Sequence, residues 1–315
     1  MNIVKLVFRV GKKKDKQMTG RDIGIALWVT VLWSGAIIAQ KIALVQYSIF
    51  TWNFLRVAMA FPFIFFFLKP QKSFLKYCLC GFFLFAIYPF FLGLGLQSSL
   101  GAGMTSFFLQ TQVFFVILCG AFFLKEKPTW YQLVGILISF VGVYFMKASS
   151  STYEVPLLGV LSLLASGLFF GIGVVLTKKY KLGTNLADVV WLSAASVGPL
   201  LLACFVAEGP QVTFDNIIHI SPTVFLCLTF TSLFSIIWAT YLWFTLLQRV
   251  SIAATTPFML LVPIFVNVFS ILFLGEKLSL SQIGAGLIII LGAIFAQGIY
   301  APFLTMGLRL RKKYD

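Results

Sequence analysis

Arg56 lies about two helical turns inside a long apolar run, and Trp52 and Asn53 lie within one turn of it. No Asp or Glu of the chain lies at a matching depth, so the guanidinium must meet a backbone carbonyl, a water molecule or an anionic group. A carboxylate on a small molecule would satisfy it. The alternative is that the long side chain extends to the headgroups at the near end of the run. Asn53 and Arg56 are therefore candidate binding residues.

A second polar group, Gln110 with Thr111 and Gln112, interrupts the centre of another apolar run. Residues two apart are about 200° apart around a helix, so the two glutamines face different neighbours. Gln110 shares its face with Gly103 and Ser106, small residues that leave room for a ligand. We therefore choose Gln110 for a cavity, keep Ser106 and Gln112 as candidates, and leave open that both glutamines only bond neighbouring helices.

Aromatic, hydroxyl and amide side chains recur at helical spacing in further apolar runs. The spacing predicts that Thr231, Ser235 and Trp238 share one face. Pro263 frees a carbonyl that either coordinates a ligand or marks a kink. The further candidate binding residues are Trp33, Ser34, Trp238, Tyr241, Thr256 and Asn267.

Catalytic chemistry finds no support in this sequence. There is no HExxH or GxSxG motif and no carboxylate inside an apolar run, the five cysteines lack metal-ligand spacing, and His219 is the one histidine. We expect no enzyme, no metal and no cofactor. Because intramembrane Asp, Glu or His residues carry protons in most proton-coupled carriers, facilitated efflux or exchange is favoured over proton antiport.

The elements that must position these residues are long apolar helices. The 315 residues are 60% hydrophobic and 10% charged, too apolar for one soluble core. A helix needs about 20 apolar residues to cross the bilayer. The sequence predicts an all-α polytopic membrane protein with ten transmembrane helices near 23–44, 50–68, 75–96, 102–124, 130–147, 156–178, 186–207, 222–247, 252–274 and 280–300.

An internal repeat divides the ten runs into two halves. Residues 123–146 recur as residues 273–296 with nine identities in twenty-four positions. If both termini are cytoplasmic, 20 of the 24 Lys and Arg residues face the cytoplasm, and the Glu126-Lys127 pair lies inside while its copy Glu276-Lys277 lies outside. The halves are therefore two inverted five-helix repeats, an arrangement typical of transporters. The basic charge marks membrane orientation, so no nucleic acid is expected.

The runs LQTQVFFVILCGAFFLKEK (109–127) and TPFMLLVPIFVNVFSILFLGEKLSLSQIGAGLIIILG (256–292) carry a resemblance to a known family. The chain resembles the EamA family of the drug/metabolite transporter superfamily over all ten runs, and it is similar to the branch of bacterial cysteine and O-acetylserine exporters. The resemblance implies a ten-helix basket with a central substrate cavity, the last helix of each half packed at the periphery, and export across the inner membrane.

We therefore expect a secondary transporter that exports small amino acids or related metabolites by alternating access. The alternatives are an importer or exchanger of S-adenosylmethionine or nucleotide-type metabolites, and a non-transporting scaffold. The expected partners are a small carboxylate-bearing substrate and the lipid bilayer of the bacterial inner membrane, and a homodimer is left open. The expected organisation is a basic cytoplasmic N-terminus (1–22), two repeats (23–147 and 156–300) and a basic cytoplasmic tail (301–315).

Overall fold

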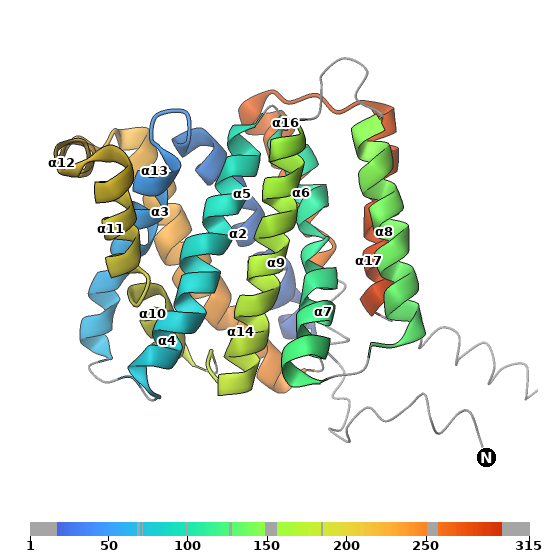
Figure 1. Cartoon of the computed structure of the whole chain (residues 1–315), viewed down its shortest axis with the longest axis horizontal. Coiled ribbons are helices and arrows are strands. Elements are labelled where there is room, and N and C mark those ends of the chain that lie inside the picture. Colours follow the sequence, from blue (N-terminus) through green and yellow to red (C-terminus); the bar gives the residue numbers. More distant parts are fainter. Residues whose placement is uncertain are drawn as a thin grey trace, which may run out of the picture.

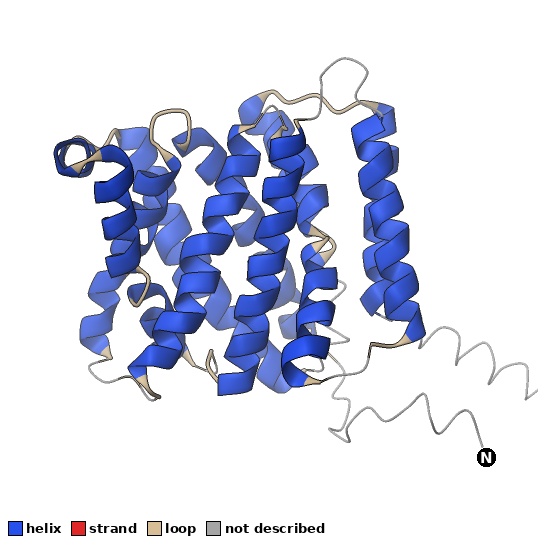
Figure 2. Cartoon of the chain, viewed as in Figure 1, coloured by secondary structure: helices blue, strands red, loops and turns tan. Residues whose placement is uncertain are grey.

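The computed structural model describes residues 18–67, 70, 72–98, 100–125, 128–148, 156–183, 185–250 and 258–297. All regular structure in these ranges is helical (Figures 1 and 2). Seven helices or helix series are long and apolar enough to cross a membrane, and three shorter apolar helices accompany them. The fold class is confirmed as an all-helical polytopic membrane protein, while the count of ten spans remains a prediction.

The first half of the chain forms five consecutive helices or helix series. The second series is interrupted at residues 59–60 and the fourth at residues 110–111. Its elements are α2 (Gly20–Ala43), α3 (Ile49–Ala58), the 3₁₀ helix η1 (Phe61–Phe66), α4 (Phe74–Gly81), the π-helix η2 (Phe82–Ile87), α5 (Tyr88–Gln97), α6 (Ala102–Leu109), α7 (Gln112–Leu124) and α8 (Trp130–Ala148).

The second half repeats this order and adds one short helix. Its elements are α9 (Leu157–Tyr180), α10 (Leu186–Ala194), α11 (Val197–Glu208), α12 (Pro210–Ile218), α13 (Pro222–Thr229), the π-helix η3 (Phe230–Ala239), α14 (Thr240–Arg249), α16 (Val262–Leu274) and α17 (Leu280–Gln297). The spacing of apolar residues did not predict α12. It begins where Gly209 has φ +84°, a conformation that favours glycine, and Pro210 supplies a helix start.

Irregular backbone occurs at equivalent places in both halves. The fourth span breaks between α6 and α7 at residues 110–111, and a turn at residues 260–261, 150 positions later, precedes α16. The third span contains η2 and its counterpart contains η3. Helix interruptions and π-helical turns at membrane depth are tolerated where the backbone is buried in protein or lines a cavity, and they often mark functional positions.

Each half places its first helix against the other half. α2 packs on α16 and on the series α13–η3–α14, whereas α9 packs on α7 and α5. A Cβ added to Gly171 would lie 2.7 Å from the backbone carbon of Phe115, and one added to Gly167 would lie 3.0 Å from that residue's ring. The GxxxG face of α9 therefore serves close helix packing, as this pattern predicts.

The last helices of the two halves, α8 and α17, cross each other at one side of the molecule (Figure 1). The Ser139 hydroxyl donates to the Ile289 carbonyl at 2.9 Å. A Cβ on Gly142 would meet Ile289 at 2.7 Å, and one on Gly292 would meet Ser139 at 2.0 Å. Ser139 and Ile289 are equivalent in the repeat, as are Gly142 and Gly292. The crossing is therefore antiparallel and nearly two-fold symmetric, as inverted halves require.

The two edges of the helix bundle are named here after the predicted orientation. The inner edge is the one where α2 begins and α7 ends, and the outer edge carries the connection from α16 to α17 (Figure 1). Lys125 ends α7 at the inner edge, while Glu276 and Lys277 lie in the outer connection. Glu126 and Lys127 lie outside the described residues.

We expect membrane-impermeant thiol labelling of intact cells to mark a cysteine introduced at Lys277 and to leave one at Lys127 unlabelled, on a background without the five native cysteines. The reason is the excess of basic residues in the loops that lie on the predicted inner side. Permeabilised cells, in which both cysteines should react, give the control. Labelling of Lys127→Cys alone in intact cells would contradict the predicted orientation.

Candidate substrate-binding site

Arg56 is buried in the bundle and points toward the middle of the third span. The residue is 8% exposed, and its Nη2 donates to the Phe85 carbonyl at 3.2 Å. Phe85 lies in η2, four residues before Pro89, whose missing N–H leaves that carbonyl without its usual α-helical donor. The guanidinium therefore bonds a backbone group deep in the bundle, rather than extending to the near end of α3.

Several polar atoms of α3 and of the adjoining part of η3 are buried without a hydrogen-bond partner. They are Arg56 Nε, Trp52 Nε1, Asn53 Oδ1 and Thr231 Oγ1. The Asn53 Nδ2 group donates to the Ile49 carbonyl at 2.9 Å, and the Ser232 hydroxyl donates to the main-chain carbonyl of Arg56 at 2.7 Å, which joins α3 to η3. Buried polar groups in folded proteins almost always have partners. Unpaired donors and acceptors on the two elements that meet at Arg56 are therefore suited to a polar ligand.

A second polar group forms where the interrupted fourth and ninth spans meet. Gln110 Nε2 donates to the Met259 carbonyl at 3.3 Å. Met259 lies four residues before Pro263, so its carbonyl also lacks the usual helical donor. Asn267 Nδ2 donates to the Pro263 carbonyl at 2.6 Å and lies 3.5 Å from the Ser106 hydroxyl, and Asn267 Oδ1 is buried without a partner. The structure thus brings Ser106, Gln110 and Asn267 together at a contact between the two halves.

The backbone at Gln112 lies against a different segment from the one that the Gln110 side chain contacts. Its Cα lies 3.3 Å from the position of a Cβ on Gly167 of α9, and its Oε1 is buried without a partner. Gln110, by contrast, is directed to the segment that precedes α16. The backbone at Gln112 therefore belongs to the packing surface between α7 and α9.

Ser34 and Trp33 lie on α2, where it packs against the second half. The Ser34 hydroxyl donates to the Thr30 carbonyl at 2.7 Å and to the Val262 carbonyl at 3.2 Å. Thr30 makes the equivalent bond to the Phe258 carbonyl at 3.2 Å. The Trp33 ring lies 5.5 Å from the Trp243 ring. This stripe of α2 therefore joins the two halves through backbone carbonyls near the interruption of the ninth span.

The structure corrects the expected face of the eighth span. Thr231 and Ser235 are buried at 2% and 7% exposure, whereas Trp238 is 41% exposed and its ring lies 6.2 Å from that of Trp28. All three residues belong to η3, and π-helical turns hold more residues than α-helical ones, so a face drawn from α-helical spacing is rotated along the segment. Tyr241 lies on α14 beside a pocket at the inner edge, and Thr256 lies outside the described residues.

Sequence reasoning missed the backbone partners in both polar groups. The Phe85 and Met259 carbonyls accept bonds from Arg56 and Gln110. Each carbonyl precedes a proline by four residues, and this spacing was visible in the sequence. Pro89 is therefore a sequence signal for the Phe85 carbonyl that our prediction did not use. Pro263 was recognised as the source of a freed carbonyl, but its partner Gln110 was not.

Two carboxylates of the second half bind helix N-termini of the first half at the outer edge. Glu208 accepts from the backbone N–H of Thr51 at 3.2 Å, from its hydroxyl at 2.7 Å, and from the hydroxyl of Ser48. Glu276 accepts from the backbone N–H groups of Ala102 at 2.7 Å and Gly103 at 3.0 Å. Carboxylates are favoured at helix N-termini, where backbone N–H groups lack partners. These contacts hold the two halves together at this edge.

A corresponding contact joins the halves at the inner edge. The Tyr77 hydroxyl on α4 donates to the Asp188 carboxylate on α10 at 2.5 Å. Trp191 on α10 donates its indole N–H to the Phe67 carbonyl at 2.9 Å. Both edges are therefore bridged between the halves, and the polar groups around Arg56 and Gln110 lie between them.

Inverted halves, interrupted spans and polar groups at membrane depth define the class of this protein as a membrane transporter. The EamA-like transporter family model matches residues 22–148 and 157–297. The chain belongs to this family, and it is not an enzyme.

Individual relatives agree with this class. The chain is 29% identical over 305 residues to a probable amino-acid metabolite efflux pump of Escherichia coli strain K12, covering 94% of this chain and 98% of the relative. The Salmonella typhimurium protein of the same description is 28% identical over the same coverage. One crystal structure matches with a TM-score of 0.59 at 15% identity, over 89% of this chain and 97% of that chain, which shows a shared fold.

Proposed function

We propose that this protein exports small amino acids or related metabolites across the bacterial inner membrane, and that Arg56 binds the carboxylate of the cargo. The observation that carries the proposal is the buried guanidinium, which bonds one freed carbonyl and keeps an unpaired Nε. A cargo carboxylate would supply the missing acceptor and the missing negative charge. The names of the Escherichia coli and Salmonella typhimurium relatives support this class of cargo and this direction.

The arrangement of the two polar groups between two bridged edges supports alternating access. Opening the outer edge requires Glu208 and Glu276 to leave the helices that they cap, and opening the inner edge requires Asp188 and Tyr77 to separate. Each carboxylate released in this way regains hydration, which offsets part of the lost hydrogen bonding. The cargo then meets Arg56 from one side at a time.

Counterflow in proteoliposomes tests the proposal without assuming how transport is coupled. Vesicles loaded with unlabelled serine, O-acetylserine, leucine or an adenosyl compound would be diluted into labelled cargo of the same kind. We expect transient accumulation of the labelled amino acids and none of the adenosyl compound. Accumulation of the adenosyl compound alone would favour the nucleotide-type alternative, and no accumulation of any cargo would favour a non-transporting scaffold.

The two glutamines of the fourth span should respond differently to alanine. Gln110→Ala removes a side chain at the contact between interrupted spans, so we expect counterflow to fall at least tenfold with little loss of folded protein. Gln112→Ala changes the packing surface with α9, so it should lower the melting temperature and leave transport measurable. Normal counterflow in both variants would remove the fourth span from the binding site.

A further inference from the structure

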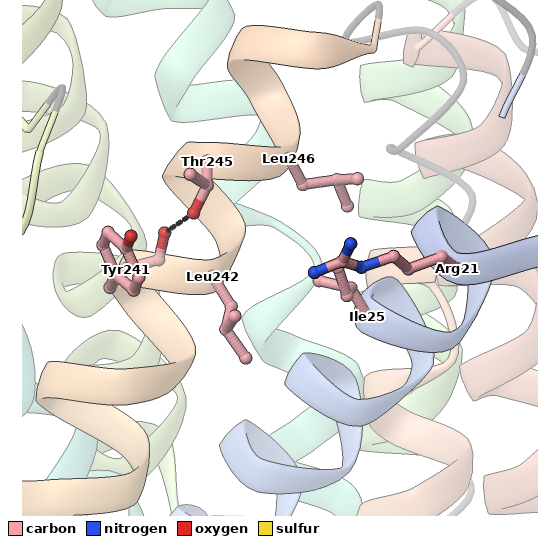
Figure 3. Close-up of a pocket in the computed structure, with 6 residues that line it drawn as sticks. All are labelled: Arg21, Ile25, Tyr241, Leu242, Thr245 and Leu246. Carbon is pink, nitrogen blue, oxygen red and sulfur yellow. Dashed lines mark hydrogen bonds between the residues drawn. The ribbon is translucent and has the colours of Figure 1, made fainter. Parts of the chain in front are cut away.

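A separate pocket lies at the inner edge, between the start of α2 and the end of α14 (Figure 3). It has a volume of about 150 Å³. Its lining residues are Arg21, Ile25, Tyr241, Leu242, Thr245 and Leu246. A cavity of roughly this size accommodates a molecule as large as benzene. The body of a small amino acid would fit in it.

The lining combines one cation with a hydroxyl and aliphatic walls. Figure 3 shows the Arg21 side chain extending from α2 toward α14, with Leu242 and Leu246 opposite. The Thr245 hydroxyl donates to the Tyr241 carbonyl, so its oxygen lone pairs remain available to accept a bond from an ammonium group. The neighbouring acid, Asp22, accepts from the backbone N–H of Thr19 at 3.0 Å and from its hydroxyl at 2.7 Å.

We propose that this pocket is an inner-face subsite, in which Arg21 binds the carboxylate of a small amino-acid cargo before the cargo reaches Arg56. This inference rests on the proposed function. Arg21 supplies the donors for the carboxylate, Thr245 supplies an acceptor, and Ile25 and Leu242 contact the side chain of the cargo. A guanidinium at the inner face raises the local concentration of carboxylates where an exporter collects them.

The subsite predicts an effect on one side of the membrane only. In vesicles of known orientation, Arg21→Gln should raise the KM for leucine or O-acetylserine presented at the inner face by about two- to fivefold, the range of an ion pair made by an exposed side chain. The KM and the maximal rate of uptake from the outer face should stay unchanged. Because a carrier without an energy source has the same ratio of maximal rate to KM in both directions, the maximal rate of efflux should rise by the same factor as the inner KM. Lys179→Gln, which removes an exposed basic residue at the end of α9, is the matched control and should change none of these values. Equal inner KM values in parent and Arg21→Gln would overturn the subsite.

A lipid headgroup is the rival occupant, because it also presents an anion at this edge. The same assay in vesicles of neutral phosphatidylcholine and in vesicles with added phosphatidylglycerol separates the two. Cargo binding predicts the same KM ratio in both lipids, whereas an effect of Arg21→Gln that needs phosphatidylglycerol would overturn the proposal in favour of lipid.

A binding measurement keeps the subsite testable if transport itself fails. Ile25→Cys, on a background without native cysteines, would be reacted with a thiol reagent from the inner face. Leucine should slow this reaction, and leucinamide, which lacks the carboxylate, should not. If leucine slows the thiol reaction but no counterflow occurs, the subsite is supported and the proposed export is contradicted. If counterflow occurs but leucine does not slow the thiol reaction, the export is supported and the subsite is contradicted.

Discussion

Arg56→Gln is expected to reduce transport of carboxylate-bearing amino acids by about 10- to 150-fold, the factor that corresponds to the 1.5–3 kcal/mol of a hydrogen bond to a charged group. Glutamine keeps an amide nitrogen at the position of Nε, and it removes the charge together with the Nη2 that donates to the Phe85 carbonyl. The effect should be specific for the cargo carboxylate. Leucinamide lacks the carboxylate, so its transport should not fall further in the variant. The measurement is counterflow of leucine and leucinamide in proteoliposomes.

Ser232→Ala is the matched control for this prediction. It removes the hydroxyl that bonds the main-chain carbonyl of Arg56 and leaves the guanidinium in place. We expect a lower melting temperature with leucine transport within about twofold of the parent, because one buried hydrogen bond contributes roughly 1 kcal/mol to folding. If Arg56→Gln and Ser232→Ala gave equal losses of transport and of folded protein, Arg56 would have a structural role alone.

Gly171→Ala is expected to destabilise the folded protein by about 1–3 kcal/mol, the usual cost of overpacking. The added Cβ would lie 2.7 Å from the backbone carbon of Phe115 and 2.9 Å from the Val116 nitrogen. Both are main-chain atoms, so no side chain can turn aside, and α9 must move away from α7. The yield of monodisperse protein and its thermal unfolding in detergent measure the effect.

Gly284→Ala tests whether the loss of stability in Gly171→Ala comes from the contacts of the added Cβ or from replacing a helical glycine as such. A Cβ on Gly284 would meet nothing within 4 Å. Alanine is a better helix former than glycine by up to about 1 kcal/mol, so this variant should be as stable as the parent or slightly more stable. A destabilised Gly284→Ala together with an unaffected Gly171→Ala would contradict the packing of α9 on α7.

The long helices could be predicted from hydropathy because the length of an apolar run is fixed by the thickness of the bilayer. The sixth run was expected at residues 156–178, and α9 spans Leu157–Tyr180. The interruption of the fourth span was not predicted. Residues 102–124 read as one continuous apolar run, and the turn at Gln110 and Thr111 contains no proline or glycine. The one indication of this interruption in the sequence was the equivalence of the fourth span with the ninth span, which carries Pro263.

The candidate site was predictable in its residue types but not in its contacts. Arg56 was predicted to be a site residue because placing a charge inside an apolar run costs free energy. Its partner, the Phe85 carbonyl, lies on another span, and spacing along one helix carries no information about the helix opposite. Trp238 shows the same limit within one helix, because a helical face can be drawn from spacing only while the number of residues per turn stays constant.

The crossing of α8 and α17 has a consequence for the transport cycle. In an inverted repeat, the inward-open and outward-open states are related by exchanging the conformations of the two halves. Ser139 and Ile289 are equivalent positions, as are Gly142 and Gly292, so this exchange would map the helix crossing onto itself, apart from the one hydrogen bond that Ser139 donates. We therefore expect this pair of helices to keep the same crossing in the inward-open and outward-open states. The other helices of the bundle would then rearrange around a fixed contact.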